Sequence, residues 1–264
     1  MNRTALVTGA TDGTGYAIAE RFAKDGWNVA ITSRELARAQ AAASALKEQY
    51  GVETFAYGLE VMNEDQISGM FAELSAAGFP VDALVCNAAN LGNAMPDLFE
   101  IDFDMWFNVI QTNIGWNFMF ARNAARYMKE KGKGSIVFIG SVTGIRALKG
   151  KSAYVASKSG LHGLSRALAI DLAQYGIRVN TVVAGTIKTK RYMANPEMYN
   201  SPHCMIPMRE QGAADFIDIA EAAYFLSSDA AKFVTGSELR VDGGQAAQLC
   251  YEKELTNPYT FGKK

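Results

Sequence analysis

Tyr154 and Lys158 are four residues apart in the segment Ser152–Lys158. On a helix this spacing puts both side chains on one face, about one turn apart. A tyrosine phenol is a poor acid or base at neutral pH, because its unperturbed pKa is about 10. A fixed ammonium group nearby favours the phenolate and lowers that pKa. The pair can therefore exchange a proton with a carbonyl or hydroxyl group, although this spacing alone more often belongs to an ordinary helix surface.

Two further polar residues are candidates for the same site. Ser141 lies thirteen residues before Tyr154 and follows the apolar run Ile136–Gly140, which predicts a buried strand with the hydroxyl at its carboxyl end. Asn113 lies in a helical stretch that is otherwise rich in Trp, Phe, Ile and Met, so its amide needs a partner. It is either a satisfied core amide or the residue that holds a water leading to Lys158.

A glycine-rich loop follows the first predicted strand and precedes a helix. Gly9, Gly13 and Gly15 give the spacing Gly-x-x-x-Gly-x-Gly within Thr8–Gly15. Glycines allow the backbone to turn tightly and approach a pyrophosphate, whose charge the helix N-terminus stabilises. A lone glycine cluster is often only a tight turn, but the strand–loop–helix context predicts a dinucleotide site.

The end of the second strand indicates which dinucleotide binds. An NAD site favours a carboxylate there, for the ribose 2′-hydroxyl, and an NADP site favours a cation, for the 2′-phosphate. Arg34 can form a forked contact with a phosphate, and Ser33 can donate a hydrogen bond. Glu35 complicates the choice, although an acidic residue is also favoured in the first turn of a helix. These residues favour NADP(H), with NAD(H) as the alternative.

The elements that position these residues alternate between short β-branched runs and amphipathic helical stretches. This alternation predicts an α/β fold, a doubly wound, Rossmann-like parallel sheet of seven strands with helices on both faces. No linker or repeat divides residues 1–264, so we expect a single domain. The predicted strands are Thr4–Thr8, Asn28–Thr32, Glu53–Tyr57, Ala83–Cys86, Ile136–Gly140, Arg178–Val183 and Glu238–Val241. The predicted helices are Gly15–Lys24, Ala37–Tyr50, Gln66–Ala77, Met105–Glu130, Tyr154–Gln174 and Ile217–Ser227.

Composition narrows the class of protein. The chain has 264 residues, 49% of them hydrophobic, which is enough for the core of one large domain. A net charge of -1 gives no indication of nucleic acid or an anionic membrane as a partner. The three cysteines have no metal-type spacing and suit a reducing compartment. With no leader pattern and no transmembrane run, we expect a cytoplasmic protein without a metal site.

These motifs together resemble the short-chain dehydrogenase/reductase family, in its single-domain branch of roughly 250 residues. The resemblance extends from Thr4 to Gly244. It is carried by the glycine loop, the Asn87-Ala88 pair, Asn113, Ser141, Tyr154-x-x-x-Lys158 and Val241-Asp242-Gly243-Gly244, in the family's order and spacing.

The resemblance implies a catalytic tetrad of Asn113, Ser141, Tyr154 and Lys158. Tyr154 would exchange a proton with the substrate oxygen, and Ser141 would orient that oxygen. Lys158 would lower the pKa of Tyr154 and bind the nicotinamide ribose, while Asn113 would hold a water of the proton relay. Hydride would pass between the nicotinamide and the carbonyl carbon.

The family pattern also implies the ligand contacts. The cofactor contacts would be Gly9, Thr11, Asp12, Gly13, Thr14, Gly15, Ser33, Arg34, Glu60, Val61, Asn87, Ala88, Ala89, Tyr154, Lys158, Ile187 and Thr189. The substrate contacts would be Ser141, Tyr154, Gly185 and Tyr192. The chain departs from the family pattern at Glu60, usually Asp, at Cys86 and Ala89 in the usual Asn-Asn-Ala-Gly, and at Ala184 in the usual Pro-Gly.

Three regions outside these motifs bear on the substrate. The irregular stretch 188–214 is expected to be a substrate lid, or a loop packed on the protein's own body, and the apolar tail 245–264 is expected to dock on a neighbouring subunit or close the pocket. Arg146, Lys149, Lys151 and Arg191 indicate either a substrate with a carboxylate or other anionic group, or a solvated loop. His162 is expected on a helix surface or at an interface.

The sequence therefore predicts an NADP(H)-dependent oxidoreductase that interconverts a secondary alcohol and a ketone. The aromatic and Met-rich lid favours a hydroxysteroid or bile acid. The alternatives are a sugar or polyol dehydrogenase, a 3-oxoacyl thioester reductase, or a non-catalytic NADP-sensing protein. The long helices Met105–Glu130 and Tyr154–Gln174 resemble the pair through which family members form dimers and tetramers, so a homo-oligomer, typically a homotetramer, is expected.

Overall fold

Seven parallel strands form the central sheet, in the order β3-β2-β1-β4-β5-β6-β7. The computed structural model describes residues 2–92, 97–194, 206–208 and 212–248. The strands are β1 (Thr4–Thr8), β2 (Asn28–Ser33), β3 (Thr54–Gly58), β4 (Val81–Cys86), β5 (Gly134–Ile139), β6 (Ile177–Ala184) and β7 (Glu238–Val241). The predicted Rossmann-like, doubly wound fold is therefore confirmed.

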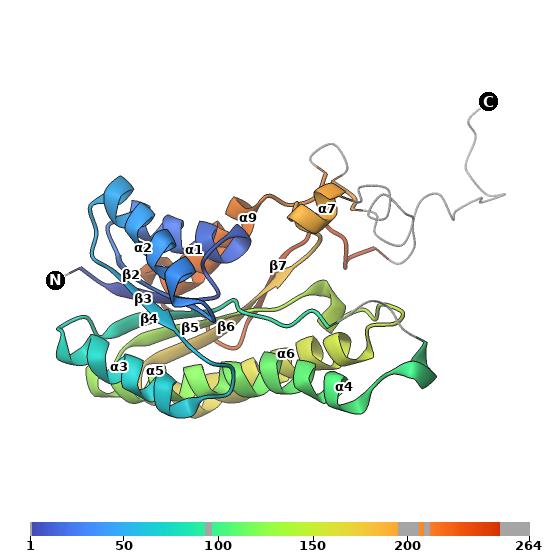
Figure 1. The fold of residues 1–264 in the computed structure, drawn as a ribbon, viewed down its shortest axis with the longest axis horizontal. Helices are drawn as coiled ribbons and strands as arrows, with labels where there is room; N and C mark the ends of the chain where they lie inside the picture. The colour runs from blue at the N-terminus through green and yellow to red at the C-terminus, as the bar shows by residue number, and fades with distance from the viewer. Residues whose placement is uncertain (1, 93–96, 195–205, 209–211, 249–264) are drawn as a thin grey trace.

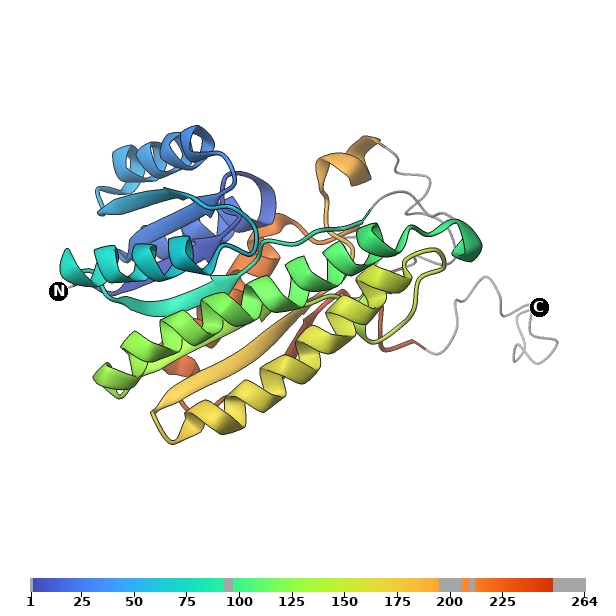
Figure 2. The same cartoon turned by 60° about the horizontal axis from the view of Figure 1, so that its bottom comes forward.

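Helices cover both faces of this sheet (Figure 1). One layer consists of α1 (Gly13–Lys24), α2 (Leu36–Tyr50) and α9 (Phe216–Ser227). The other consists of α3 (Glu64–Ala76), α4 (Phe103–Ile110), α5 (Asn117–Lys131) and α6 (Ser152–Ala173). In Figure 2 the α4–α5 stretch runs beside α6. The short helix α7 (Lys190–Ala194) lies beyond the strand ends, and short 3-10 turns occupy Leu98–Glu100, Val142–Gly144 and Asp229–Ala231.

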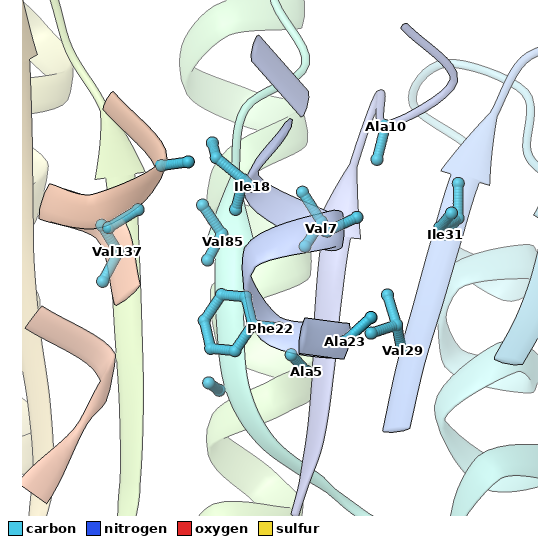
Figure 3. Close-up of a cluster of buried hydrophobic side chains, with 14 of the residues drawn as sticks. Ala5, Val7, Ala10, Ile18, Phe22, Ala23, Val29, Ile31, Val85 and Val137 are labelled. Atoms are coloured by element: carbon cyan, nitrogen blue, oxygen red, sulfur yellow. The ribbon is translucent and has the colours of Figure 1, made fainter. Parts of the chain in front are cut away.

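The five inner strands are buried almost throughout, as parallel strands between two helix layers must be, and the edge strands β3 and β7 are only half-buried. Figure 3 shows the layer between the sheet and α1, where Phe22 packs over Val7 and Val85 and all three side chains are fully buried. A second cluster lies under α3, α5 and α6 and contains Phe71, Phe120 and Met128. The two clusters fix the sheet from both sides and hold its carboxyl edge in place.

A crevice opens between β1 and β4, the point at which the strand order of the sheet reverses. β1 pairs with β2 on one side and β4 on the other, so the connections after β1 and β4 leave toward opposite faces. Ligands bind at such a switch point, outside the carboxyl ends of the strands. The backbone amides of Asn87 and Ala88, after β4, both donate to the Thr8 hydroxyl at 3.0 Å and tie the two strand ends together.

One predicted helix differs in the structure. The stretch predicted as a single helix over Met105–Glu130 contains a π-helical segment, Gln111–Trp116, between α4 and α5. The lid predicted at 188–214 and the tail at 245–264 lie in large part outside the described residues. Among the residues that are described, no helix is long and apolar enough to cross a membrane.

Candidate active site

A single long cleft of about 1870 Å³ follows the carboxyl edge of the sheet. It begins at the glycine loop after β1, passes the ends of β2, β4 and β5, and finishes at α7. This is the edge at which α/β proteins bind nucleotides. The cleft brings together most of the predicted site residues: Gly9, Thr11, Asp12, Gly13, Thr14, Gly15, Ser33, Arg34, Val61, Asn87, Ala88, Ala89, Ser141, Tyr154, Gly185, Ile187 and Thr189.

The glycine loop has the backbone that a pyrophosphate site requires. Gly9 and Gly13 have positive φ angles of 63° and 54°, which side chains other than glycine rarely adopt. A Cβ on Gly15 would lie 2.3 Å from the Gly9 carbonyl oxygen and 2.6 Å from the Asn87 amide nitrogen. No side chain caps the N-terminus of α1, so its first N–H groups face the cleft. The loop therefore fits a dinucleotide diphosphate.

Cations line the far end of the cleft, beside the end of β2. Arg34 is exposed there, and Arg38 follows one helical turn later in α2. Arg38 pairs with Asp12 at 3.1 Å and with Glu35 at 3.7 Å, which holds its guanidinium at the cleft wall. Two guanidinium groups at this point fit a ribose 2′-phosphate. Arg38 was not predicted, although its spacing of one turn from Arg34 was available in the sequence.

Tyr154 and Ser141 meet at the middle of the cleft. Ser141 is close enough to the Tyr154 phenol to lower its pKa, while burial raises that pKa more strongly, to about 12. Thr143 donates from its hydroxyl to Ser141 Oγ at 2.9 Å. The Ser141 hydrogen is therefore directed away from Thr143, and the Tyr154 phenol stays protonated at neutral pH. The pair can donate hydrogen bonds to a carbonyl oxygen placed in the cleft.

Lys158 lies behind Tyr154 and is almost fully buried. Its Nζ donates to the Ile139 carbonyl at 2.7 Å and lies 5.7 Å from the centre of the Tyr154 ring. Burial lowers the pKa of Lys158 to about 8. The expected lowering of the Tyr154 pKa by Lys158 is not seen in this arrangement, because desolvation dominates both groups.

The loop after β6 closes the nicotinamide end of the cleft. Ile187 and Thr189 line it, and Ile187 forms an isolated bridge with Ala214. The Gln245 side-chain oxygen accepts from the Thr186 amide at 3.1 Å. The segment after β7 thus fixes the loop that was predicted to hold the nicotinamide amide.

Comparison with known proteins agrees with this geometry. The family model described as enoyl-(acyl carrier protein) reductase matches residues 9–246. The 3-oxoacyl-(acyl-carrier-protein) reductase FabG of Chlamydia trachomatis is 34% identical over 247 residues, which cover 93% of this chain and 98% of that protein. The chain belongs to the short-chain dehydrogenase/reductase family. Like other members it is an oxidoreductase that acts on CH–OH groups.

Solved structures of short-chain dehydrogenases/reductases superpose over nearly the whole chain. A putative gluconate dehydrogenase from Agrobacterium tumefaciens has a TM-score of 0.86 at 33% identity, covering 94% of this chain and 97% of that one. A variant of ElxO with NADPH bound has a TM-score of 0.83 at 28% identity, covering 94% of this chain and all of that one.

Asn113, the fourth residue of the predicted tetrad, is fully buried in the π-helical segment and does not line the cleft. Its Nδ2 donates to the Asn90 carbonyl and to Ser157 Oγ, both at 2.9 Å, and its Oδ1 accepts from the Asn90 amide at 2.7 Å. Both amide hydrogens are taken by protein. The side chain therefore holds the loop at Asn90, which follows β4. It has no amide hydrogen left to donate to a water.

Three predicted ligand contacts do not line the cleft, namely the buried Lys158, Glu60 and Tyr192. Glu60 is exposed, and its carboxylate accepts from Asn63 Nδ2 at 3.5 Å, at the start of α3. Tyr192 is on α7, but Lys190, Arg191 and Met193 line the cleft instead. The prediction missed several residues that do line the cleft, namely Arg38, Leu59, Asn90, Leu91, Asn108, Trp116, Thr143, Phe216 and Gln245. No group of metal-ligating side chains occurs in the part of the chain that the structure describes.

Proposed function

We propose that the protein is an NADP(H)-dependent oxidoreductase that interconverts a ketone and a secondary alcohol, with Tyr154 as general acid and base. One observation carries this proposal. The Tyr154 phenol and the Ser141 hydroxyl both line the cleft, between the glycine loop and α7, and Ser141 is close enough to lower the pKa of the phenol. A substrate carbonyl oxygen placed against Tyr154 and Ser141 would lie between the dinucleotide end of the cleft and its end at α7.

The position of Tyr154 in the cleft indicates the source of the proton that the substrate oxygen receives. Bound NADPH supplies the hydride that the carbonyl carbon receives. Tyr154 donates its phenolic proton to the carbonyl oxygen, and Ser141 orients that oxygen with its own hydrogen bond. In the reverse direction the Tyr154 phenolate accepts the alcohol proton. The raised pKa of about 12 keeps Tyr154 in the proton-donating form at neutral pH.

Lys158 and Asn113 do not contact the reacting carbonyl group in this proposal. Lys158 holds the nicotinamide ribose and brings a positive charge to within 5.7 Å of the Tyr154 ring centre. Asn113 is a positioning residue, because its side chain fixes the Asn90 backbone on both sides of the residue.

The preference for NADP(H) over NAD(H) rests on Arg34 and Arg38. Both lie where the 2′-phosphate of a bound dinucleotide would be, and a guanidinium forms paired, charge-assisted hydrogen bonds with phosphate. The solved relative with NADPH bound supports the same preference.

The relatives favour a 3-oxoacyl thioester as substrate, since the curated matches of Chlamydia trachomatis and Staphylococcus epidermidis are 3-oxoacyl reductases. The hydroxysteroid prediction finds no support among them, and most of the lid residues on which it depended lie outside the described part of the chain. A sugar or polyol derivative is the second candidate, supported by the resemblance to a putative gluconate dehydrogenase.

A substrate screen tests the proposal. Purified protein is mixed with NADPH or NADH and a panel of ketones and 3-oxoacyl thioesters, and the absorbance of the reduced cofactor is followed. We expect NADPH-dependent turnover of at least one ketone. NADPH binding without turnover on the whole panel would instead support the NADP-sensing alternative.

We also propose that the protein acts as a homo-oligomer in the cytoplasm. The face formed by α4, α5 and α6 carries exposed apolar side chains, among them Phe103, Phe107, Phe118 and Ile170. Light scattering coupled to size exclusion would give the mass of the assembly, and a monomer would refute this part of the proposal.

A further inference from the structure

A tight turn after β7 brings a polar side chain to the wall of the cleft. Gly243 and Gly244 have positive φ angles of 57° and 85°, which allow the chain to reverse its direction there. The Asp242 carboxylate accepts from the backbone amides of Gly244 and Ala246, both at 2.9 Å. The residue that this turn presents is Gln245, which lines the cleft and is only 9% exposed.

Segments after β5, β6 and β7 hold Gln245 in one orientation. Its backbone amide donates to the Asp242 carbonyl at 3.0 Å, and its carbonyl accepts from Arg146 Nη1 at 3.3 Å. Its side-chain Oε1 accepts from the Thr186 amide at 3.1 Å and from the Thr186 hydroxyl at 3.3 Å. Gly185 leaves room for this contact, since a Cβ there would lie 3.0 Å from Gln245 Oε1. The side chain is therefore fixed before a ligand binds.

These contacts determine which atom of the Gln245 amide faces the cleft. A backbone N–H group only donates, so the side-chain atom that meets the Thr186 amide is the oxygen. Nε2 has no hydrogen-bond partner among the described residues, yet it is open to solvent. Because the rest of the residue is buried and the residue lines the cleft, this donor is available to a ligand in the cleft.

The strand order puts this donor on the far side of Ser141 from the glycine loop. The glycine loop follows β1, Ser141 follows β5, and Thr186, to which Gln245 is bound, follows β6. In the sheet β6 is the neighbour of β5 on the side away from β1. A dinucleotide that extends from the glycine loop toward Ser141 therefore approaches from the opposite side, and the Gln245 donor lies next to the substrate.

We propose that Gln245 is a specificity-determining residue, whose Nε2 donates a hydrogen bond to a second carbonyl oxygen of the substrate. The ketone of that substrate lies against Tyr154 and Ser141. This inference rests on the proposed function, since it specifies the substrate of the same site. A donor that the protein already holds in place discriminates well, because a substrate without the matching acceptor leaves it unpaired in the complex.

The chemistry of the Gln245 amide favours a carbonyl oxygen over a hydroxyl group as its partner. A carbonyl oxygen only accepts hydrogen bonds, and Gln245 has only donors left for a ligand. A sugar hydroxyl also needs an acceptor, and the Gln245 oxygen is already bound to Thr186. The residue therefore selects a 3-oxoacyl compound, in which one methylene group separates the ketone from the acyl carbonyl, over a simple ketone or a polyol derivative.

The test uses two ketones that differ in one oxygen. The 3-oxohexanoyl thioester of N-acetylcysteamine is compared with S-(3-oxohexyl)-N-acetylcysteamine, a thioether in which a methylene group replaces the acyl carbonyl. Gln245→Glu keeps an oxygen for the Thr186 amide and replaces only the donor, whereas Gln245→Met removes both. Gln49→Glu is the matched control, because it makes the same chemical change at an exposed position of α2 outside the cleft lining.

We expect the wild type to have a higher kcat/KM with NADPH for the thioester than for the thioether. Gln245→Glu and Gln245→Met should each lower that ratio by about five- to tenfold, which corresponds to one hydrogen bond, and Gln49→Glu should leave it unchanged. A ratio that either Gln245 variant leaves unchanged would overturn the contact while leaving the proposed function intact. If Gln245→Glu instead weakens NADPH binding with the ratio unchanged, the amide serves the nicotinamide.

Binding decides the question if neither ketone is turned over. Calorimetry measures both compounds with the NADP⁺-loaded protein, in which the oxidised cofactor cannot reduce a ketone. A preference for the thioester that is present in the wild type and in Gln49→Glu and is lost in Gln245→Glu supports the contact without any turnover. Absent binding, or the same preference in all three proteins, contradicts it.

Discussion

The two ends of the cleft are built in different ways. At the dinucleotide end, cations and acids alternate, and Arg38 is paired with Asp12 and Glu35. At the substrate end, the described lining carries cations, among them Lys149, Lys190 and Arg191, and no acidic residue. The described lining therefore has both signs of charge at the first end and only positive charge at the second.

The ends also differ in how local their structure is. The glycine loop comes from one continuous strand–loop–helix unit, Thr4–Lys24, whereas the substrate end is assembled from segments after β4, β5, β6 and β7. A local unit can serve the same cofactor in many proteins, because its geometry depends on few contacts outside it. The assembled end can change its substrate by changes in any one of its loops.

The largest effect on cofactor binding is expected at the dinucleotide end. In Gly15→Ala the new Cβ would lie 2.3 Å from the Gly9 carbonyl oxygen, so the loop must move. NADPH affinity should fall by roughly 100-fold, about 2.7 kcal/mol, as measured by calorimetry. Unchanged affinity would show that the loop does not hold the diphosphate.

Gly69→Ala is the matched control for that substitution. Gly69 lies inside α3, and a Cβ there would meet nothing within 4 Å. Cofactor affinity should be unchanged, and the free energy of unfolding should rise by about 0.5–1 kcal/mol, since alanine favours the helix.

An intermediate effect is expected from the cations near β2. Arg34→Ala and Arg38→Ala should each weaken NADPH by about tenfold relative to NADH, because one charge-assisted contact with the 2′-phosphate is lost. The ratio of the two dissociation constants measures this. Equal weakening of both cofactors would contradict the preference for NADP(H), and Lys24→Gln controls for the general loss of positive charge.

A further effect concerns stability as well as activity. The pKa of Lys158 falls from about 10.4 in the unfolded chain to about 8 in the folded protein, so its burial destabilises the fold at neutral pH. This destabilisation is full below pH 8 and disappears as the pH rises above about 10. Lys158→Met should therefore raise the free energy of unfolding at pH 7 by about 1–3 kcal/mol while abolishing turnover.

Denaturant titrations of wild type and Lys158→Met at pH 7 and at pH 10 would check this. The difference should shrink at pH 10, because the buried lysine is then neutral in the folded protein and the lysine of the unfolded chain has begun to lose its proton. A variant that is less stable than the wild type at both values would mean that the hydrogen bond to the Ile139 carbonyl outweighs the cost of burial.

The local elements could be predicted from the sequence, and elements that depend on distant contacts could not. The glycine loop, the strand before Ser141 and the Tyr154–Lys158 helix face follow from spacing within a few residues. The π-helical segment at Asn113 does not, because it accompanies hydrogen bonds to Asn90 and Ser157, which lie in other elements. Glu60 was predicted as an adenine contact from its position, but it does not line the cleft, and its carboxylate accepts from Asn63, the N-cap of α3.

His162 illustrates the same limit. It was expected on a helix surface or at an interface, but it is only 4% exposed. The room for its ring comes from Gly140 and Gly144, where a Cβ would lie 2.6 Å and 3.0 Å from the imidazole atoms. Glu238 on β7 approaches its Nδ1 at 3.4 Å. None of these neighbours is close to His162 in the sequence.

The central claim is that the proton comes from the Tyr154 phenol. Tyr154→Phe keeps the ring and removes only the hydroxyl, so we predict that NADPH binds within a few-fold of wild-type affinity while kcat falls by about 10²–10⁴. Calorimetry for binding and a single-turnover assay with the best ketone of the screen measure both quantities on one protein. A variant that binds NADPH and reduces the ketone at a near-normal rate would contradict the account.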